Sequence, residues 1–155
     1  MTAAVRVLQS QGVAFDPCLY KYEEKGGTKH SAQELGVNEH AVVKTLIMET
    51  DAHAPLIVLM HGDKQVSTKQ LARLIGAKSV TPCKPEVADK HSGYKVGGTS
   101  PFGTKRNMPV YMEESIAALE RIYINGGQRG FLVAISPQDA VRVLQPTLVT
   151  VAIED

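Results

Sequence analysis

Apolar positions along the chain follow two spacings, one typical of strands and one typical of helices. Continuous or alternating apolar residues predict strands at residues 13–22, 44–50, 55–61, 108–112, 121–125, 131–136 and 147–153. The runs at 44–50 and 55–61 are separated by a short polar loop, so they predict a hairpin of central strands.

Start and stop residues place helices between these strands. Thr2 and Gly12 bound the first predicted helix, over residues 3–11. A second helix is predicted after the capping box formed by Ser31 and Glu34, and Gly36 ends it. Asn38, Ser67 and Ser136 are each predicted to cap the start of a further helix. Two more helices are predicted, one from Pro85 to about Gly93 and one over residues 113–119. Single helices among adjacent strand pairs predict a mixed α/β, α+β-like fold and not a regular array of parallel units.

The composition is that of an ordinary globular protein. The chain has 155 residues, of which 43% are hydrophobic and 21% charged, with a formal net charge of +1, so residues 1–155 are interpreted as one domain. No apolar run approaches the roughly 20 residues of a membrane span, and residues 1–12 lack the pattern of a signal peptide, so a cytoplasmic location is expected. We predict no metal site, because Cys18 and Cys83 are isolated and the histidines are scattered. We also predict no cofactor, because the chain lacks the glycine pattern of dinucleotide-binding proteins.

Positive charge is concentrated in the middle of the chain. Residues 64–106 contain nine Lys and Arg against two acidic residues. This distribution indicates either a surface for phosphates or nucleic acid, or lysines on the solvated faces of helices.

The segment HSGYKVGGTSPFG at residues 91–103 carries the candidate chemistry. Gly97 and Gly98 allow positive φ or a close approach to a ligand, and Pro101 restricts the chain after Thr99 and Ser100. Such a loop can present backbone N–H groups to a carbonyl or phosphate oxygen, although a tight structural turn has the same composition. No G-x-S-x-G or metalloprotease motif occurs, so an enzyme built on this loop would position and polarise its substrate.

A second candidate lies in the apolar segment VVKTLI, where Lys44 is the charged residue. A lysine in this setting either extends to solvent or points into a polar pocket. Lys44-Thr45, GGTSPFG at 97–103 and INGGQRGF at 124–131, in this order, resemble the YbaK/EbsC family from Phe15 to about Leu144. These proteins are free-standing relatives of the prolyl-tRNA synthetase editing domain.

The resemblance implies a barrel-like mixed sheet flanked by helices. It also implies trans-editing, in which mischarged tRNA is the substrate, prolyl-tRNA synthetase a partner, and Cys-tRNA(Pro) deacylation the best-known activity, without a metal or cofactor. In the cysteine-specific members the thiol of the substrate is thought to attack its own ester, so the protein needs no nucleophile.

By the same resemblance, Lys44 would hold the terminal adenosine phosphate or the ester, and the backbone of Gly97 and Gly98 would contact the aminoacyl ester. The other implied substrate-binding residues are Tyr20, Thr45, Thr99, Ser100, Pro101, Asn125, Gly126, Gly127 and Arg129.

Two positions depart from the cysteine deacylases of this family. Leu132 stands where they have an acidic residue, and Asn125 where they have a serine. Three alternatives therefore stay open: a Cys-tRNA(Pro) deacylase, a deacylase for another small amino acid such as Ala-tRNA(Pro), and a non-catalytic module that binds aminoacyl-tRNA or a synthetase.

Overall fold

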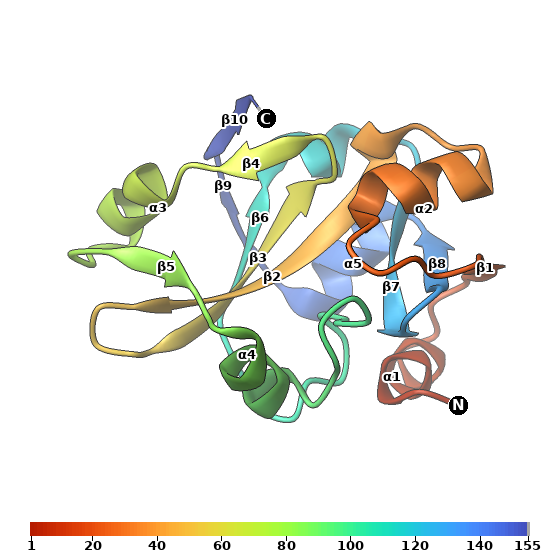
Figure 1. Ribbon diagram of the computed structural model, residues 1–155, viewed down its shortest axis with the longest axis horizontal. Helices are drawn as coiled ribbons and strands as arrows, with labels where there is room; N and C mark the ends of the chain where they lie inside the picture. Colours follow the sequence, from red (N-terminus) through yellow and green to blue (C-terminus); the bar gives the residue numbers. More distant parts are fainter. Residues whose placement is uncertain (155) are drawn as a thin grey trace.

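A computed structural model describes residues 1–154, and its centre is a mixed eight-stranded sheet (Figure 1). The strands are β1 (Asp16–Leu19), β2 (Val42–Thr50), β3 (Pro55–His61), β4 (Lys64–Val66), β5 (Val80–Pro82), β6 (Val110–Glu113), β7 (Ile122–Gln128), β8 (Phe131–Ile135), β9 (Thr147–Val149) and β10 (Ala152–Glu154). The order across the large sheet is β1-β8-β7-β2-β3-β6-β9, with β5 also pairing with β2, while β10 and β4 form a separate pair.

The sheet contains both kinds of strand pairing. β2 and β3 form the predicted antiparallel hairpin, with Thr45 opposite Leu59. β2 is parallel to β7, β3 to β6, and β6 to β9. The mixed α/β prediction is confirmed.

The helices are α1 (Ala3–Ser10), α2 (Gly27–Leu35), α3 (Thr68–Ile75), α4 (Pro85–Ser92) and α5 (Pro137–Leu144), with short 3-10 helices η1 (Glu39–Ala41) and η2 (Glu114–Ala118). The predicted caps Thr2, Asn38, Ser67 and Ser136 each accept a backbone N–H through the side chain. The longest helix among the described residues has 9 residues, and none of these helices is long and apolar enough to cross a membrane.

Helices cover both faces of the sheet. On one face, α2 contributes Ala32 to a cluster with Val42 and Leu132, and α3 contributes Leu71 to a neighbouring cluster. On the other face, α1, α4 and α5 pack on a larger cluster that includes Leu8. Residues of opposite parity on the same strands supply the two faces, as the alternation of side chains along a strand requires.

Several predicted boundaries were wrong. Helix α2 begins at Gly27 and not after Ser31, because Thr28 is anchored by hydrogen bonds to the Glu39 carboxylate (2.7 Å) and the Gly62 carbonyl (3.1 Å). Ser31 lies inside the helix, and its hydroxyl donates to the Thr28 carbonyl.

The strand predicted at 13–22 is limited to β1, and the predicted helix at 113–119 is the 3-10 helix η2. The strand predicted at 147–153 is divided between β9 and β10, because the buried Glu113 carboxylate accepts the N–H groups of Val151 and Ala152 at 2.7 and 2.9 Å. The turn predicted at Asn125-Gly126-Gly127 is an irregular part of β7, and the chain reverses after Gln128.

Candidate functional site

The site lies where one edge of β2 lacks a neighbouring strand. On this edge, pairing with β7 ends at Val43 and pairing with β5 begins at Met48. The Gly62 N–H donates to the Val42 carbonyl on the β3 side, whereas the Cys83 N–H donates to the Ile47 carbonyl on the other side. Because the backbone groups of a strand alternate between its two edges, those of Thr45 point into the gap between β7 and β5.

A cavity of about 950 Å³ opens over this gap. Of the sequence-predicted site residues, those that line it are Tyr20, Lys44, Thr45, Gly97, Thr99, Asn125 and Arg129. They come from β2, from the loop after α4, from the end of β7 with the residue that follows it, and, in the case of Tyr20, from the residue just after β1. These segments are far apart in the sequence. The fold therefore gathers the three motifs around one cavity.

Thr45 is unusual in its side chain as well as in its backbone. Its Oγ1 is buried and is the buried side-chain oxygen that lacks a hydrogen-bond partner among the described residues. A buried unsatisfied hydroxyl destabilises the folded chain by about 1–3 kcal/mol. A buried group of this kind calls for an explanation, and Thr45 lies in the cavity wall among the motif residues.

Lys44 lies on the side of the cavity that β4 covers. Its Nζ donates to the Lys64 carbonyl at 2.5 Å, which helps to fix the position of the ammonium group. The side chain is only partly exposed. A positive charge fixed at a cavity wall can attract an ester oxygen or a phosphate.

The glycine pair has a specific environment. Gly97 has a φ of +91°, and a Cβ there would lie 2.5 Å from the hydroxyl oxygen of Tyr22. Gly98 packs against the second motif, because a Cβ there would lie 2.7 Å from the Arg129 backbone nitrogen. The Gly98 N–H already donates to the Lys95 carbonyl at 2.8 Å, so it is engaged within the loop.

Side chains of the second motif join the two loops. Asn125 donates from Nδ2 to the Gly97 carbonyl at 3.3 Å, and its Oδ1 accepts from the Gly127 N–H at 2.6 Å. Arg129 donates from Nε to the Val96 carbonyl at 2.9 Å. The loops therefore form one hydrogen-bonded unit at the rim of the cavity.

Arg129 also lies with its guanidinium carbon 5.2 Å from the centroid of the Tyr22 ring. Tyr22 lines the cavity but was missed by the sequence analysis. Its position two residues after Tyr20 was the available indication, because alternate residues of an extended chain point to the same side.

The remaining predicted residues lie behind the cavity wall. Ser100 and Pro101 are buried, and the Ser100 hydroxyl accepts the Phe102 N–H at 3.2 Å. Gly126 packs on the Phe131 ring, and Gly127 has a φ of +97°. Their positions indicate a role in the shape of the loops and not in contact with a ligand.

The cavity wall is apolar at Leu132, the position that departs from the acidic residue of the cysteine deacylases. Leu132 is 4% exposed and packs with Ala32 and Val42 in one buried cluster. Glu23 lines the cavity elsewhere, where its carboxylate lies 3.3 Å from His30 Nδ1.

Two titratable groups of the cavity are held in their neutral forms. Burial, together with the neighbouring Glu49 carboxylate, raises the pKa of the Cys83 thiol to about 11. Burial also raises the pKa of Tyr20, although the Gly130 backbone opposes the shift. Cys83 therefore stays a thiol near neutral pH and is a poor nucleophile, since the thiolate is the reactive form.

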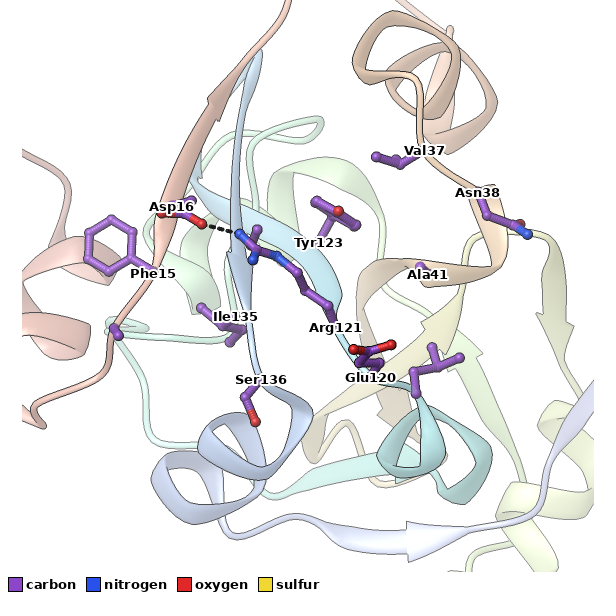
Figure 2. A pocket seen from close by; sticks show the side chains of 13 residues that line it. Phe15, Asp16, Val37, Asn38, Ala41, Glu120, Arg121, Tyr123, Ile135 and Ser136 are labelled. Carbon is purple, nitrogen blue, oxygen red and sulfur yellow. Dashed lines mark hydrogen bonds and ion pairs between the residues drawn. The ribbon is translucent and has the colours of Figure 1, made fainter.

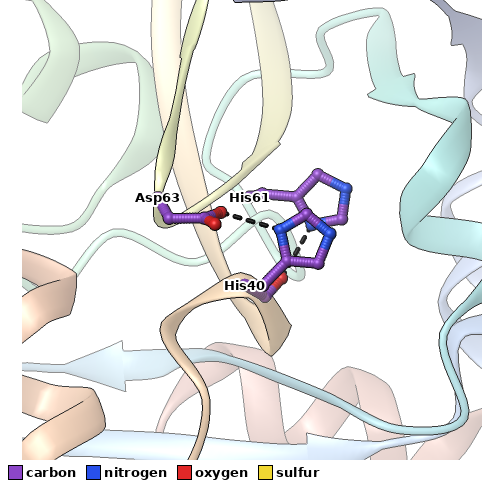
Figure 3. A group of neighbouring side chains, drawn as sticks. All are labelled: His40, His61 and Asp63. Carbon is purple, nitrogen blue, oxygen red and sulfur yellow. Dashed lines mark hydrogen bonds and ion pairs between the residues drawn. The ribbon is translucent and has the colours of Figure 1, made fainter. Parts of the chain in front are cut away.

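A histidine cluster lies outside the cavity, around His40, His61 and Asp63 (Figure 3). Their ligand atoms lie within 4.8 Å of one another, a spacing that a metal ion could bridge. The two imidazole rings, however, are stacked with an interplanar angle of 5° and centroids 3.7 Å apart. Nitrogen lone pairs lie in the ring planes, so two stacked rings cannot point at one shared ion.

His61 is also fully satisfied. Its Nδ1 lies 2.7 Å from the His40 carbonyl, and its Nε2 lies 2.7 Å from the Ser115 hydroxyl. Burial lowers the pKa of His61. With Nδ1 protonated, His61 donates to the His40 carbonyl and accepts from the Ser115 hydroxyl. Both ring nitrogens therefore serve to hold the fold together.

A second cavity of about 720 Å³ lies beside Phe15, Tyr123 and Ser136 (Figure 2). Three of its polar side chains are engaged within the chain. Arg121 forms an ion pair with Asp16, and the Ser136 hydroxyl donates to the Gln138 side-chain carbonyl at 2.7 Å. None of the residues predicted from the sequence motifs lines it.

Basic side chains lie on the elements that surround the first cavity. The basic residues of α3, of α4 and of the segments just before β5, just before α4 and after α4 are exposed: Lys69, Arg73, Lys78, Lys84, Lys90, Lys95, Lys105 and Arg106. Lys64 differs, because its Nζ pairs with Glu154 at 2.7 Å. Thr68, Pro85 and Val96, from three of these segments, line the cavity.

Comparison with known proteins identifies the family of the chain. The family model described as an aminoacyl-tRNA editing domain matches residues 23–143. A protein of Enterococcus faecalis, EbsC, provisionally named a Cys-tRNA(Pro)/Cys-tRNA(Cys) deacylase, is 26% identical over 138 residues, which cover 88% of this chain and 84% of that protein. A proline–tRNA ligase of Thermodesulfovibrio yellowstonii is 29% identical over 109 residues, and the match spans only 19% of that protein.

Solved structures show the same fold. The crystal structure of a protein of unassigned function, APE2540, has a TM-score of 0.90 and 23% identity, and the match covers 98% of this chain and all of that chain. A provisionally assigned trans-editing enzyme for prolyl-tRNA synthetase has a TM-score of 0.85 and 18% identity, with 99% of both chains covered.

Proposed function

Because the chain belongs to the aminoacyl-tRNA editing domain family, we propose that it is a trans-editing deacylase that clears mischarged Cys-tRNA(Pro). Cys-tRNA(Cys) is a further candidate substrate, in line with the name of the EbsC relative. The observation that carries this proposal is the convergence of Lys44, the Gly97 loop and the Asn125–Arg129 turn around one cavity. We further propose that residues 1–155 act as one editing domain, in the cytoplasm, alongside prolyl-tRNA synthetase.

The proposed reaction uses the thiol of the substrate. The cysteinyl sulfur attacks its own ester carbonyl, the carbon–oxygen bond to the terminal ribose breaks, and the thiol proton goes to the leaving ribose oxygen. The cavity supports this assignment because its own thiol, Cys83, is held protonated by a pKa of about 11. Holding the substrate thiol close to the carbonyl can lower the barrier by roughly 7–11 kcal/mol.

In this proposal, Lys44 and the Gly97 loop orient and polarise the ester. Lys44 presents its positive charge from the cavity wall, held by the Lys64 carbonyl. The Gly98 N–H is engaged with Lys95, so Gly97 is the better candidate for the backbone contact to the ester oxygen. Removal of one such donor typically lowers the rate by about 10²–10³-fold.

The exposed basic residues around the cavity would hold the acceptor end of the tRNA. They lie on α3, on α4, on the segments before and after β5 and on the loop to Arg106, and residues of α3, α4 and this loop also line the cavity. Neutralisation of phosphates by such residues releases counterions, so binding should weaken steeply as salt rises.

A second substrate is favoured by one specific feature. Leu132 makes the inner wall apolar by packing with Ala32 and Val42, an environment that suits the methyl side chain of alanine. Ala-tRNA(Pro) lacks a thiol, so its deacylation would need a positioned water as the nucleophile, and the overall reaction would be a hydrolysis. A chain that binds aminoacyl-tRNA without turnover is the remaining alternative.

The test is deacylation of Cys-tRNA(Pro), Ala-tRNA(Pro) and Pro-tRNA(Pro) by the wild type and by Lys44→Ala. We expect the wild type to cleave the cysteinyl ester and Lys44→Ala to lose this activity. Cleavage of the alanyl ester alone would assign the second substrate. If tRNA binds and no ester is cleaved, the deacylase proposal is wrong and the binding module is the better assignment.

A further inference from the structure

Helix α1 lies outside the segment that matches the editing-domain model, yet its first residues contact both loops of the candidate site. The match covers residues 23–143, whereas α1 covers Ala3–Ser10. In Figure 1, α1 lies beside the end of β7 and near the loop that follows α4. The contacts begin at Thr2, the N-cap of this helix.

The Thr2 hydroxyl makes two hydrogen bonds that link α1 to the second motif. It accepts the Val5 N–H at 3.1 Å, as an N-cap does, and donates to the Gly126 carbonyl at 2.6 Å. Packing reinforces the link, because a Cβ on Gly127 would lie 3.2 Å from the Thr2 Cβ. One hydroxyl thus fixes both the start of the helix and the position of Gly126.

The same end of α1 also contacts the Gly97 loop, where that loop returns to the core. Gly103 has a φ of +67°, and a Cβ there would lie 2.9 Å from the Ala3 carbonyl oxygen. Tyr94 closes this loop by donating its hydroxyl to the Phe102 carbonyl at 2.6 Å. The Tyr94 ring also touches Gly127, since a Cβ there would lie 2.8 Å from Tyr94 Cε1.

A short chain of contacts then leads from α1 to the cavity. Gly126 follows Asn125, whose Oδ1 holds the Gly127 N–H at 2.6 Å and whose Nδ2 reaches the Gly97 carbonyl at 3.3 Å. A shift of Gly126 would therefore move both ends of the Asn125 side chain. Misplacement of reacting groups by about 1 Å can cost 10²-fold in rate.

We propose that Thr2 is a positioning residue for the deacylation reaction: its hydroxyl holds Gly126, and through Asn125 it sets the position of the Gly97 loop. This inference rests on the proposed function. Thr2 acts through its neighbours and touches no substrate. Bracing of the loops itself can be measured without any turnover.

The experiment compares Thr2→Val, Thr2→Ser and Ser136→Ala, all with the tag after residue 155, so that the tag does not adjoin Thr2. Thr2→Val keeps the shape and removes the hydroxyl, while Thr2→Ser restores it. Ser136→Ala is the matched control, because Ser136 caps α5 by accepting the Gln138 N–H at 3.2 Å and does not line the 950 Å³ cavity.

For Cys-tRNA(Pro), we expect Thr2→Val to lower kcat about tenfold with KM nearly unchanged, Thr2→Ser to recover most of the loss, and Ser136→Ala to keep the wild-type kcat. Equal kcat values for Thr2→Val and Ser136→Ala, at similar melting temperatures, would overturn the inference. A rise in KM without a change in kcat would also contradict it.

Amide hydrogen exchange separates this inference from the proposed function. Exchange over residues 95–103 and 125–130 should be faster in Thr2→Val than in the wild type, and unchanged in Ser136→Ala. If the wild type cleaves no ester, this comparison still decides whether Thr2 braces the loops. Unchanged exchange in Thr2→Val would exclude the bracing.

Discussion

Gly97→Ala tests whether the exact path of the loop matters. The added methyl group would lie 2.5 Å from the Tyr22 hydroxyl oxygen, while ordinary contacts begin at 3.4 Å. Either the Gly97 loop or the Tyr22 ring must therefore move by about 0.9 Å. This shift is close to the ~1 Å misplacement that can lower a reaction rate 10²-fold. The positive φ of +91° adds a backbone cost of about 1–2 kcal/mol for a residue with a Cβ.

The matched control is Gly76→Ala. Gly76 also has a positive φ, +76°, but a Cβ there would meet no atom within 4 Å. Both variants should lose a similar amount of stability from the backbone, measured by urea unfolding. Only Gly97→Ala should lose deacylation, by about 10²-fold in kcat/KM.

A double variant identifies the cause of the loss. Removal of the hydroxyl in Gly97→Ala/Tyr22→Phe removes the 2.5 Å contact and leaves the milder 3.1 Å contacts with the ring carbons, so part of the activity should return. The reasoning is refuted if Gly97→Ala keeps the activity of Gly76→Ala, or if Tyr22→Phe restores nothing while both variants are equally folded.

Three further predictions concern charge and titration. Lys84→Ala/Lys90→Ala should reduce the slope of log affinity for tRNA against log salt by about 0.7–0.9 for each phosphate that the variant no longer neutralises, and Arg6→Ala, on α1, should leave it unchanged. In a Cys18→Ser background, iodoacetamide should alkylate Cys83 slowly at pH 8 and much faster near pH 11, because the pKa is raised to about 11. A rapid reaction at pH 8 would contradict this. Since the folded pKa of His61 lies below 6.5, the unfolded chain binds the proton first as pH falls. The contribution of His61 to the free energy of unfolding should therefore be fully present above pH 6.5 and decrease below it. Denaturant titrations at several pH values should show a flatter decrease in His61→Asn.

Local patterns predicted the elements whose ends are set by their own residues. Ser67 caps α3 and Gly76 ends it in the left-handed conformation, as the sequence indicates. The capping box at Ser31 failed for the opposite reason. Its pattern is local, but the start of α2 is fixed by the hydrogen bonds of Thr28 to Glu39 and Gly62, which are distant in sequence.

Short strands were missed for a related reason. β4 and β5 have three residues each, too few for a period to be recognised. The break between β9 and β10 depends on Glu113, which lies 38 residues from Val151. Tertiary contacts set these boundaries, and no window of local sequence contains them.

The candidate site was predictable as a set of motifs but not as a shape. The resemblance of the three motifs to the YbaK/EbsC family indicated which residues belong together, and Lys44, Gly97 and Arg129 line the cavity. The sequence did not separate the residues of the wall from those behind it. Ser100 and Gly126 belong to the motifs, but both are buried: the Ser100 hydroxyl accepts the Phe102 N–H, and Gly126 packs on the Phe131 ring.

The gap in the β2 edge explains why this fold has a cavity at this place. A strand continuous with β7 would cover residues 44–47 and leave no space, whereas the observed edge ends with Val43 and resumes at Met48. An uncovered edge presents N–H and C=O groups that need partners when water is excluded. Thr45 adds a buried hydroxyl without a partner at the same point. A ligand with its own donors and acceptors, such as an aminoacyl ester, would satisfy these groups. The cavity therefore favours a polar substrate even though Leu132 and its neighbours make the inner wall apolar.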